Sequence, residues 1–432
     1  MMFVVESLES RRFLSAVVSV TARAAAAYEA GGTATRNFYL RRPVADAATR
    51  LAVHYTVGGK AKPGADYTSI GNVAWFKAGA ALRRVAILPI DDAIAESNES
   101  ISLALDPDPN YTIDLARNIA TIRIISNDEP TPIPTTIAWS TRAPSPIVRA
   151  EALRAVVGDK LYVLGGFSGD DGPVKRSDVY DPAADTWTQI TDLPTRLTHA
   201  GVAVDGRDIY AVGGYVGIGA TGYNQQFGTT AVWKYDVDAN AWTAMPALPK
   251  AMAGGGAAVI GRFLHYFGGN DSNRTDAGDH FALDLDNPQA GWQSRAALSD
   301  PRSHFGTAVV GVKIYVVGGQ HGNDDTLTTV TSVHAYDPAT NSWSARASLP
   351  VAVSHIASAA VVVNGRIITA GGETAHGNAT DRVTLYDPAT DAWSSITPLR
   401  AERFSGVAAF IGGAIYFTTG SSQTTTWKGL LS

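Results

Sequence analysis

One unit recurs six times between Thr135 and Ser432, and it constrains the fold more than any other feature of the chain. Each copy has a short apolar run that ends in Gly-Gly, in most copies followed by Tyr-Asp, and then a Trp. From the second glycine of one copy to that of the next, the steps are 48, 55, 50, 53 and 48 residues. A period of about 50 residues is typical of a β-propeller blade. The intact glycine pairs are Gly165-Gly166, Gly213-Gly214, Gly268-Gly269, Gly318-Gly319 and Gly371-Gly372, and the sixth copy reads Thr419-Gly420.

The order of these residues predicts how the ring closes. Trp139 precedes the first glycine pair, whereas only a short segment follows Gly420. We therefore expect six blades, with an outer strand at about residues 135–142 completing the blade whose inner strands end the chain. Such a closure leaves no exposed edge strand between the first and the last blade.

The repeated residues are those of a scaffold. The runs 161–164 and 314–317 are apolar on both faces, as a strand between two packed sheets should be. The glycines permit positive φ or close backbone approach, and the Asp-Pro-Ala-Thr segments at 337–340 and 387–390 are turn sequences. Over about two thirds of the chain, the pattern resembles the kelch family, which implies a kelch-type propeller.

Composition supports an all-β protein with two soluble domains. The chain has 432 residues, 45% of them hydrophobic, with 42 glycines and no cysteine. The absence of cysteine excludes disulfides and thiol catalysis. A net charge of -5 argues against nucleic-acid binding, and no apolar stretch approaches the ~18 residues of a membrane span. We expect a monomer.

The first 130 residues form a separate unit. Large apolar side chains occupy every second position of 51–57 and of 101–105, a pattern of half-buried strands. Three prolines then interrupt the chain at 130, 132 and 134. The predicted organisation is a tail at 1–16, a first domain at 17–128, a linker at 129–134 and a propeller at 135–432.

The first domain resembles a Calx-β domain. The resemblance rests on Gly58 to Tyr67 (GGKAKPGADY), Gly79, Asp91-Asp92 and Ala120 to Asp128 (ATIRIISND). It implies an immunoglobulin-like β-sandwich. Some members of the family bind calcium at one end of the sandwich.

An acidic loop offers candidate calcium ligands. Asp91, Asp92, Glu96 and Glu99 fall within nine residues that contain no Lys or Arg, and oxygen-rich clusters of this kind suit Ca²⁺. Ser126 stands where calcium-binding members usually carry another aspartate, so we expect weak binding at most. The alternative is a solvated acidic loop. With the residues that the resemblance adds, the predicted metal ligands are Glu29, Asp66, Asp91, Asp92, Glu96 and Asp128.

The extreme N-terminus suggests export. Glu6 to Ala16 resembles a short leader motif of large exported bacterial proteins, although its apolar run is too brief for a typical signal peptide. The alternative is a tail without a targeting role. Because Calx-β and kelch modules together resemble a surface protein, we expect an extracellular or cell-surface location.

The resemblance to the kelch family also predicts where a ligand binds. Kelch relatives that bind peptides use loops around the central channel, including an Arg shortly after a Leu-Pro. A ring of cations there would suit an acidic peptide or a sugar acid. The alternative is that each cation pairs with a nearby carboxylate such as Glu151 or Glu402. The corresponding residues are Arg149, Arg196, Lys250, Arg302 and Arg403.

Three histidines occupy equivalent places just before the inner strands of blades 2, 4 and 5. They are His199, His304 and His355. Together they could bind a transition metal. Because these blades are not all adjacent, hydrogen bonding to a neighbouring strand is the favoured interpretation, and His304 and His355 are also counted as candidate ligand contacts.

Two enzyme classes share this propeller. Copper-radical oxidases of the galactose oxidase type need a Cys, so they are excluded. Sialic-acid mutarotases remain the alternative, with Glu402, Arg403, Arg302 and His304 as candidates for acid–base work. The favoured function is a non-enzymatic binding or adhesion protein whose long loops, 216–228 and 320–331, recognise a protein or glycan partner.

Overall fold

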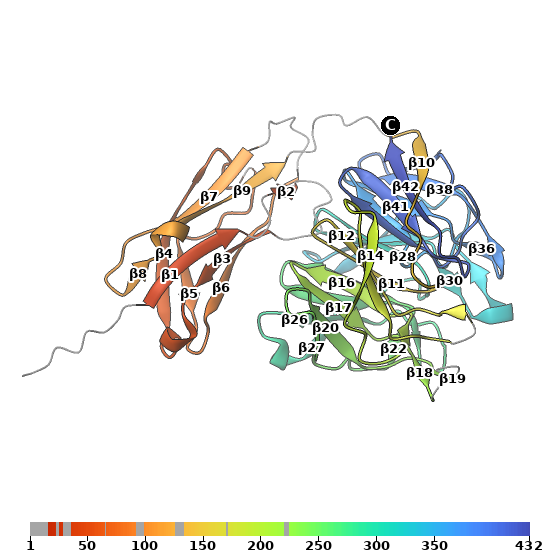
Figure 1. The fold of residues 1–432 in the computed structure, drawn as a ribbon, viewed down its shortest axis with the longest axis horizontal. Helices are drawn as coiled ribbons and strands as arrows, with labels where there is room; N and C mark the ends of the chain where they lie inside the picture. The colour runs from red at the N-terminus through yellow and green to blue at the C-terminus, as the bar shows by residue number, and fades with distance from the viewer. Residues whose placement is uncertain are drawn as a thin grey trace, which may run out of the picture. The chain divides into compact units, whose positions relative to one another are not determined.

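The structure, a computed structural model, describes residues 16–22, 26–28, 36–64, 66–91, 99–125, 134–169, 172–219 and 224–432. The described chain divides into two compact units, one before residue 126 and one from residue 134 onward. Both are built from strands (Figure 1), which confirms the all-β class. Within the described ranges, no helix has the length and apolarity that a bilayer crossing requires.

The first unit is a sandwich of two sheets, with strand orders β6-β3-β1-β8 and β2-β9-β7-β4-β5. The alternation predicted from the sequence is confirmed in β4, where Val53 and Tyr55 are buried and His54 and Thr56 are exposed. The elements are β1 (Ala16–Ala22), β2 (Ala26–Tyr28), β3 (Arg36–Arg41), η1 (Val44–Asp46), β4 (Leu51–Gly59), β5 (Val73–Phe76), β6 (Leu82–Ile87), β7 (Glu99–Leu105), β8 (Tyr111–Ile113), η2 (Leu115–Arg117) and β9 (Ile119–Ile125).

The second unit is a propeller of six four-stranded antiparallel sheets. Blade 1 consists of β11 (Leu153–Val157), β12 (Lys160–Leu164), β13 (Ser177–Asp181) and β14 (Thr186–Ile190). Blade 2 consists of β16 (Gly201–Asp205), β17 (Asp208–Val212), β20 (Val232–Asp236) and β21 (Ala241–Ala244). Blade 3 consists of β23 (Gly256–Ile260), β24 (Phe263–Phe267), β26 (His280–Asp284) and β27 (Trp292–Ser294), with η4 (Pro288–Ala290) before β27. The innermost strand of each blade contacts that of the next, and the sixth returns to the first, so the ring is closed.

Blades 4 to 6 follow the same order from the axis outward. Blade 4 consists of β28 (Gly306–Val310), β29 (Lys313–Val317), β32 (Val333–Asp337) and β33 (Ser342–Arg346). Blade 5 consists of β34 (Ala360–Val363), β35 (Arg366–Ala370), β38 (Val383–Asp387) and β39 (Ala392–Ile396). Blade 6 consists of β40 (Val407–Ile411), β41 (Ala414–Thr418), β42 (Thr426–Leu431) and β10 (Ile137–Arg142).

The predicted closure by an outer strand is confirmed. β10 pairs antiparallel with β42, and the pairing places Trp139 opposite Gly429. The Trp139 indole also donates to Pro398 O at 2.7 Å. Blade 6 therefore contains strands from both ends of the propeller sequence.

The glycine pairs join neighbouring blades. The N–H of each second glycine donates to a carbonyl of the next blade at 2.7 to 2.9 Å. The first glycines have φ between +56° and +69°, and a Cβ at Gly318 would collide with the carbonyl oxygen of Val353. The six bonds run from Gly166 to Leu197, Gly214 to Met252, Gly269 to Arg302, Gly319 to Val353, Gly372 to Arg403 and Gly420 to Arg149.

The tryptophans join the same blades at the outer edge. Each indole N–H donates to a backbone carbonyl of the preceding blade at 2.7 to 3.2 Å. The Tyr of the motif acts with them: Tyr336 donates to Asn341 Oδ1 at 2.8 Å, and this oxygen also accepts the N–H of Ala296 from the preceding blade. The scaffold role of these residues explains their repetition. The six tryptophans are Trp139, Trp187, Trp242, Trp292, Trp343 and Trp393.

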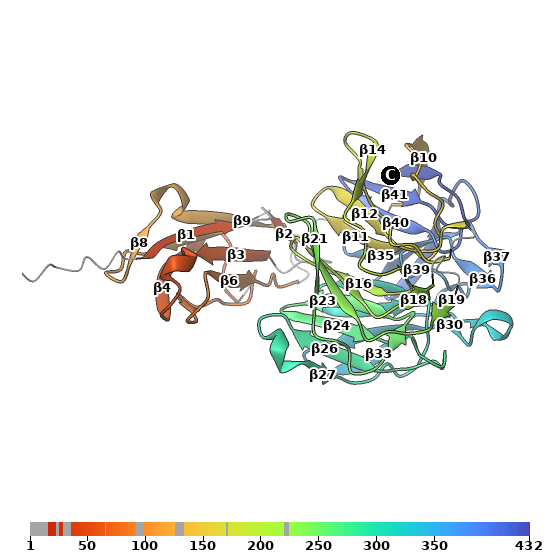
Figure 2. The same cartoon turned by 60° about the horizontal axis from the view of Figure 1, so that its bottom comes forward.

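Short strands surround one end of the propeller axis, the end at which the glycine pairs lie. We call this end the mouth. In Figure 2, β18, β19, β30 and β36 lie along one side of the propeller, whereas the opposite end carries tight turns such as 158–159. The elements at the mouth are β15 (Leu197–Thr198), β18 (Tyr215–Ile218), β19 (Asn224–Gln226), β22 (Met252–Ala253), β25 (Asn270–Asp271), β30 (Gln320–His321), η5 (Asp324–Thr326), β31 (Thr328–Thr329), β36 (Glu373–Ala375) and β37 (Asn378–Ala379).

Candidate functional site

Six equivalent residues ring the mouth, one from the segment before each innermost strand. All six have φ between +51° and +64°. An L-residue held in this left-handed region costs about 1 to 2 kcal/mol, which glycine avoids. Only one of the six is nevertheless a glycine, so the ring carries polar side chains at a conformational cost. The residues are Glu151, His199, Gly254, His304, His355 and Ser405.

The three histidines meet at the mouth although their blades are not all neighbours. The His304 ring lies 4.9 Å from that of His199 and 4.6 Å from that of His355. Gly254, between His199 and His304 in the ring, has no side chain to separate them, and a Cβ there would approach the His304 ring at 3.6 Å. The equivalence predicted from the sequence is therefore confirmed, and blade 3 supplies the space.

Glu151 lies among these side chains. Its Oε1 accepts a hydrogen bond from the Ser405 hydroxyl. The Nε2 atoms of His199 and His355 lie 3.9 and 4.0 Å from its carboxylate oxygens. Behind His355, Glu373 on β36 places Oε2 3.0 Å from His355 Nδ1. We call Glu151, His199, His304, His355, Glu373 and Ser405 the mouth cluster.

A hydroxyl precedes each histidine and fixes its ring. The Nδ1 atoms of His199, His304 and His355 lie 2.8 to 3.1 Å from these hydroxyl oxygens. Because Nδ1 of each imidazole contacts a hydroxyl, Nε2 is the ring nitrogen that remains for contacts at the mouth. The hydroxyls belong to Thr198, Ser303 and Ser354.

The imidazoles do not share one protonation state. Burial lowers the pKa of His199 to about 4 and that of His304 well below 6.5. Burial also acts to lower the pKa of His355, but the hydrogen bond with Glu373 and the charges of Glu151 and Glu373 outweigh it and raise that pKa. For Glu373 burial acts to raise the pKa, and the contact with His355 outweighs it and lowers that pKa. As the pH falls, His355 is therefore the first of the three histidines to become protonated.

Arg149 and Arg302, two of the predicted ligand contacts, lie inside their blades with no exposed surface. Arg149 pairs with Asp178 at 2.5 Å and donates to the carbonyl of Gly165. Arg302 donates to Gly318 O at 2.7 Å. Their positions differ from the expected ring of exposed cations because the guanidinium groups satisfy the carbonyls next to the glycine pairs.

The other predicted cations are partly exposed. Lys250 pairs with Asp279 at 3.2 Å. Arg196 donates to Pro173 O at 3.4 Å, and Arg403 stacks over the Trp427 ring at 4.9 Å. Ligand binding by any of these residues stays a prediction.

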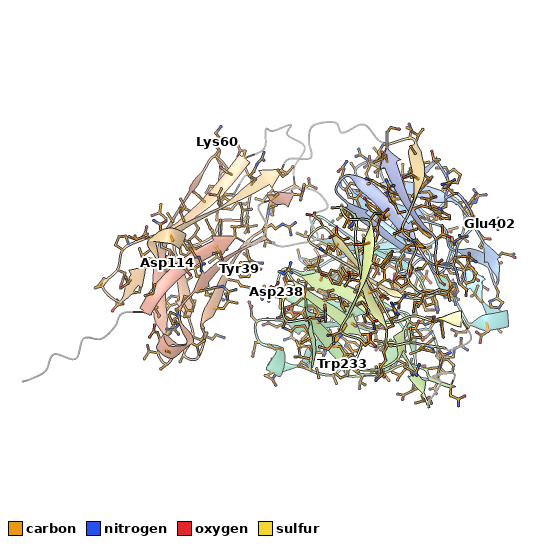
Figure 3. All side chains as sticks on the ribbon, viewed as in Figure 1. Tyr39, Lys60, Asp114, Trp233, Asp238 and Glu402 are labelled. Carbon is orange, nitrogen blue, oxygen red and sulfur yellow. The ribbon has the colours of Figure 1, made fainter. Side chains whose placement is uncertain are left out.

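Three of the four residues proposed for acid–base work, Glu402, Arg403 and Arg302, lie outside the mouth cluster. Glu402 is exposed on the segment that leads to Arg403 (Figure 3), and Arg302 is buried as described. Only His304 of that set belongs to the mouth cluster.

The predicted calcium ligands are only partly described. Asp66 is buried and accepts the N–H of Lys62 at 2.5 Å, and its carbonyl accepts the N–H of Ile90, which precedes the exposed Asp91. Within the described ranges, no three His, Asp or Glu side chains are arranged to hold a metal ion, the three mouth histidines included. Glu29, Asp92, Glu96 and Asp128 lie outside the described residues.

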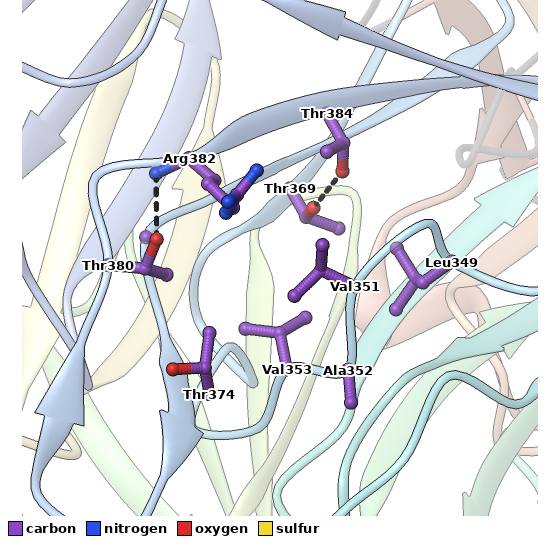
Figure 4. A pocket seen from close by; sticks show the side chains of 10 residues that line it. Leu349, Val351, Ala352, Val353, Thr369, Thr374, Thr380, Arg382 and Thr384 are labelled. Atoms are coloured by element: carbon purple, nitrogen blue, oxygen red, sulfur yellow. Dashed lines mark hydrogen bonds between the residues drawn. The ribbon is translucent and has the colours of Figure 1, made fainter.

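A shallow pocket lies on blade 5 (Figure 4). Val351 and Val353 face Thr369, Thr384 and Arg382 across it, and Thr369 and Thr384 share a hydrogen bond of 2.7 Å. None of the lining residues is a carboxylate or an imidazole, so this pocket has no group for acid–base chemistry near pH 7.

Glu151 and Glu373 were not predicted as members of the site. Each has a positional signal: Glu151 lies two residues before its innermost strand, as His199 does, and Glu373 directly follows the pair Gly371-Gly372. Alignment of the six copies position by position would have revealed both.

Comparison with known proteins supports the two-domain assignment. The family model of the Calx-beta domain matches residues 15–128, and that of the Kelch motif matches 152–194. The model of the KLHDC2/KLHL20/DRC7 Kelch-repeats domain matches residues 198–420, more than half of the chain.

Similar proteins are kelch proteins of several kingdoms. Kelch-like protein terF of Aspergillus terreus is 30% identical over 54% of this chain and 52% of its own length. The Kelch repeat-containing protein At3g27220 of Arabidopsis thaliana is 26% identical over 66% of this chain and 71% of its own. Kelch-like protein 36 of Rattus norvegicus is 26% identical over 63% of this chain and 44% of its own length. The chain thus spans only about half the length of the fungal and rat relatives.

A solved structure supports the fold. The structure of YjhT superposes with a TM-score of 0.55 at 18% identity, covering 67% of this chain and 95% of that one. At this identity the likeness concerns the fold alone. Together with the matched family models, the six linked blades show that the chain belongs to the kelch-repeat family and carries a Calx-beta domain ahead of its propeller.

Proposed function

We propose that the chain is a non-enzymatic recognition protein whose propeller binds a protein or glycan partner at the mouth. The observation that carries this proposal is a set of contacts joining the exposed loops around the mouth cluster. Loops that are already ordered lose less conformational freedom on binding, which favours recognition. We call the segments 215–219, 224–228, 270–276, 320–331 and 373–379 the collar.

Non-covalent side-chain contacts join the collar segments of neighbouring blades. Phe227 packs on Tyr215 at 5.0 Å between ring centroids, and the Arg274 guanidinium lies 4.7 Å from the Phe227 centroid. Arg274 in turn pairs with Asp324 at 2.5 Å, so blades 2, 3 and 4 are connected. Asn323 adds a hydrogen bond to the Arg274 carbonyl at 2.8 Å.

The collar continues into blade 5 and leaves side chains for a partner. Thr329 donates to Thr374 O at 2.7 Å, which joins β31 to β36. The collar exposes Ile218, with 49% of its surface accessible, together with His376 and Asn378. The collar also contains the described residues of the two long loops, 216–228 and 320–331, that were expected to determine specificity.

Acid–base catalysis on a sugar acid is the weaker alternative. The carboxylates of Glu151 and Glu373 at the mouth would repel an anionic sugar, and Arg302, a candidate for binding it, is committed to backbone carbonyls. The kelch-like names of the relatives also favour a protein partner.

Array screening tests the proposal. The purified chain is screened against peptide and glycan arrays, and the strongest ligand is measured by titration. We expect the double variant Ile218→Asp/Asn378→Lys to weaken binding at least tenfold. Val312→Ser, on an exposed turn at the opposite end of blade 4, should leave it unchanged. Equal loss in both variants, or loss only in Val312→Ser, would contradict a binding surface at the collar.

We also propose that the protein is exported and that its Calx-beta domain binds Ca²⁺ weakly. The N-terminal leader-like segment and the pairing of Calx-beta with kelch modules support export, and the run of acidic residues within 91–99 supports calcium binding. Fusing residues 1–16 to a reporter enzyme tests the first: secreted reporter activity is expected, and its full retention inside the cell would contradict export.

A further inference from the structure

The mouth cluster holds more negative than positive charge. Its carboxylates are Glu151 and Glu373, and burial keeps His199 and His304 neutral near pH 7. Even with His355 protonated, two carboxylates face one imidazolium. Charge in a partly desolvated site acts more strongly than in water, so the excess matters for what can bind.

The cations near the mouth do not cancel this charge. Arg274 is engaged with both carboxylate oxygens of Asp324 at 2.5 and 3.1 Å. Arg154 lies three residues beyond Glu151, on β11, and donates to Ala408 O at 3.3 Å. At ~3.3 Å per residue, this places its backbone about 10 Å further along the strand.

Glu151 has unused acceptor capacity. The Ser405 hydroxyl is its one donor at hydrogen-bond distance among the described residues, while His199 and His355 lie 3.9 and 4.0 Å away. An ionised carboxylate offers about four acceptor sites. The Glu151 side chain is 11% exposed, so part of this capacity faces the mouth opening.

Aromatic side chains border the mouth cluster. Phe167 contacts the His199 ring edge-on at 5.7 Å, and Phe404 contacts the His355 ring at 6.3 Å. Both phenylalanines are partly exposed. Aromatic faces beside a carboxylate favour a cation carried on an apolar stem, because the stem packs on the rings while the charge meets the acid.

We propose that the mouth binds a cationic side chain, a lysine or an arginine of a partner's basic segment, with Glu151 as the contacting carboxylate. Ammonium and guanidinium groups are donors only, with three and five N–H groups respectively, and so complement a site rich in acceptors. Glu373 contributes its charge from behind His355. The inference rests on the proposed recognition function and names the chemistry of the partner.

The test uses the full chain and four capped pentapeptides, Gly-Gly-X-Gly-Gly, in which X is Arg, Lys, Gln or Glu. Binding is followed by NMR through the histidine ring protons, at 20 and 200 mM salt. We expect millimolar binding of the Arg and Lys peptides that weakens at high salt, and no binding of the Gln and Glu peptides. Glu151→Gln should lower the affinity at least tenfold, whereas Asp159→Asn, at the exposed far turn of the same β11–β12 hairpin, should not.

Glu373→Gln provides a second variant should Glu151→Gln fold poorly, and it is expected to weaken binding severalfold. Failure of the Arg and Lys peptides to bind at 10 mM, or unchanged affinity in both glutamine variants, would overturn the inference. If array ligands of acidic sequence bind at the collar, recognition stands and the cationic partner is refuted. If no array ligand depends on the collar, the recognition proposal itself fails.

Discussion

At the scale of single residues, two kinds of position carry the fold for different physical reasons. The glycine pairs are required where the backbones of neighbouring blades touch. Blade 3 also carries a buried histidine pair, in which His265 Nδ1 lies 2.9 Å from His280 Nε2. Each kind of position predicts a measurable effect on stability.

Gly318→Ala should destabilise the propeller by about 2 to 4 kcal/mol, because it adds a collision with Val353 O to the cost of a positive φ. Gly311→Ala is the matched control. Gly311 has the same φ of +59°, but a Cβ there would meet nothing within 4 Å, so only about 1 kcal/mol is expected. Urea unfolding followed by tryptophan fluorescence measures both, since eight of the nine tryptophans lie in the propeller. Equal losses would mean that the glycine pair is not an inter-blade contact.

The histidine pair predicts that stability falls with acid. Burial lowers the pKa of His265 to about 3 and that of His280 to about 4, from 6.5. Below pH 6.5 the unfolded chain therefore binds protons that the folded chain does not, and roughly 2 kcal/mol should be lost per histidine between pH 6.5 and 5. His265→Leu/His280→Leu should reduce the pH dependence of the urea midpoint, to which His199 and His304, whose pKa burial also lowers, contribute as well. His376→Ala, an exposed site, should not reduce it. A wild-type midpoint equal at both pH values would refute this assignment.

At the scale of elements, the outer strand β10 is the feature with the clearest consequence. Replacing residues 135–142 with an equally long Gly-Ser segment should expose the edge of β42, lower the unfolding temperature of the propeller and promote aggregation. Calorimetry and light scattering measure both effects. A single sharp transition at the original temperature would show that blade 6 does not need this strand.

The elements of the propeller were predictable from the sequence because the same hydrogen bonds recur in each blade. Gly-Gly, Tyr and Trp repeat since each repeats a contact with a neighbouring blade. The mouth cluster was not predictable in the same way. Glu151 and His355 lie close together only because the ring closes. The local sequence also does not show that Arg149 forms an ion pair with Asp178. For this reason the sequence predicts exposed cations at Arg149 and Arg302, and it does not predict that Glu151 and Glu373 share a site.

At the scale of the whole molecule, the two units predict separate responses. If the Calx-beta domain binds Ca²⁺, calcium at ten times Kd should stabilise it by about 1.4 kcal/mol, with affinity near the ~10⁻⁴ to 10⁻³ M of extracellular modules. Calorimetry of the full chain in millimolar calcium and in chelator should shift one transition only. Asp91→Asn/Asp92→Asn should abolish the shift, and Asp46→Asn in η1 should preserve it. Identical curves with and without calcium would leave the acidic loop as a solvated turn.

The central claim is that recognition occurs at the mouth of the propeller. Hydrogen exchange measured by mass spectrometry, with and without the strongest array ligand, tests it most directly because it requires no substitution. We predict added protection in the collar segments 215–219, 224–228, 270–276, 320–331 and 373–379 and none in the opposite turns, such as 158–159 and 311–312. Protection confined to those opposite turns, or to the first unit, would contradict the account.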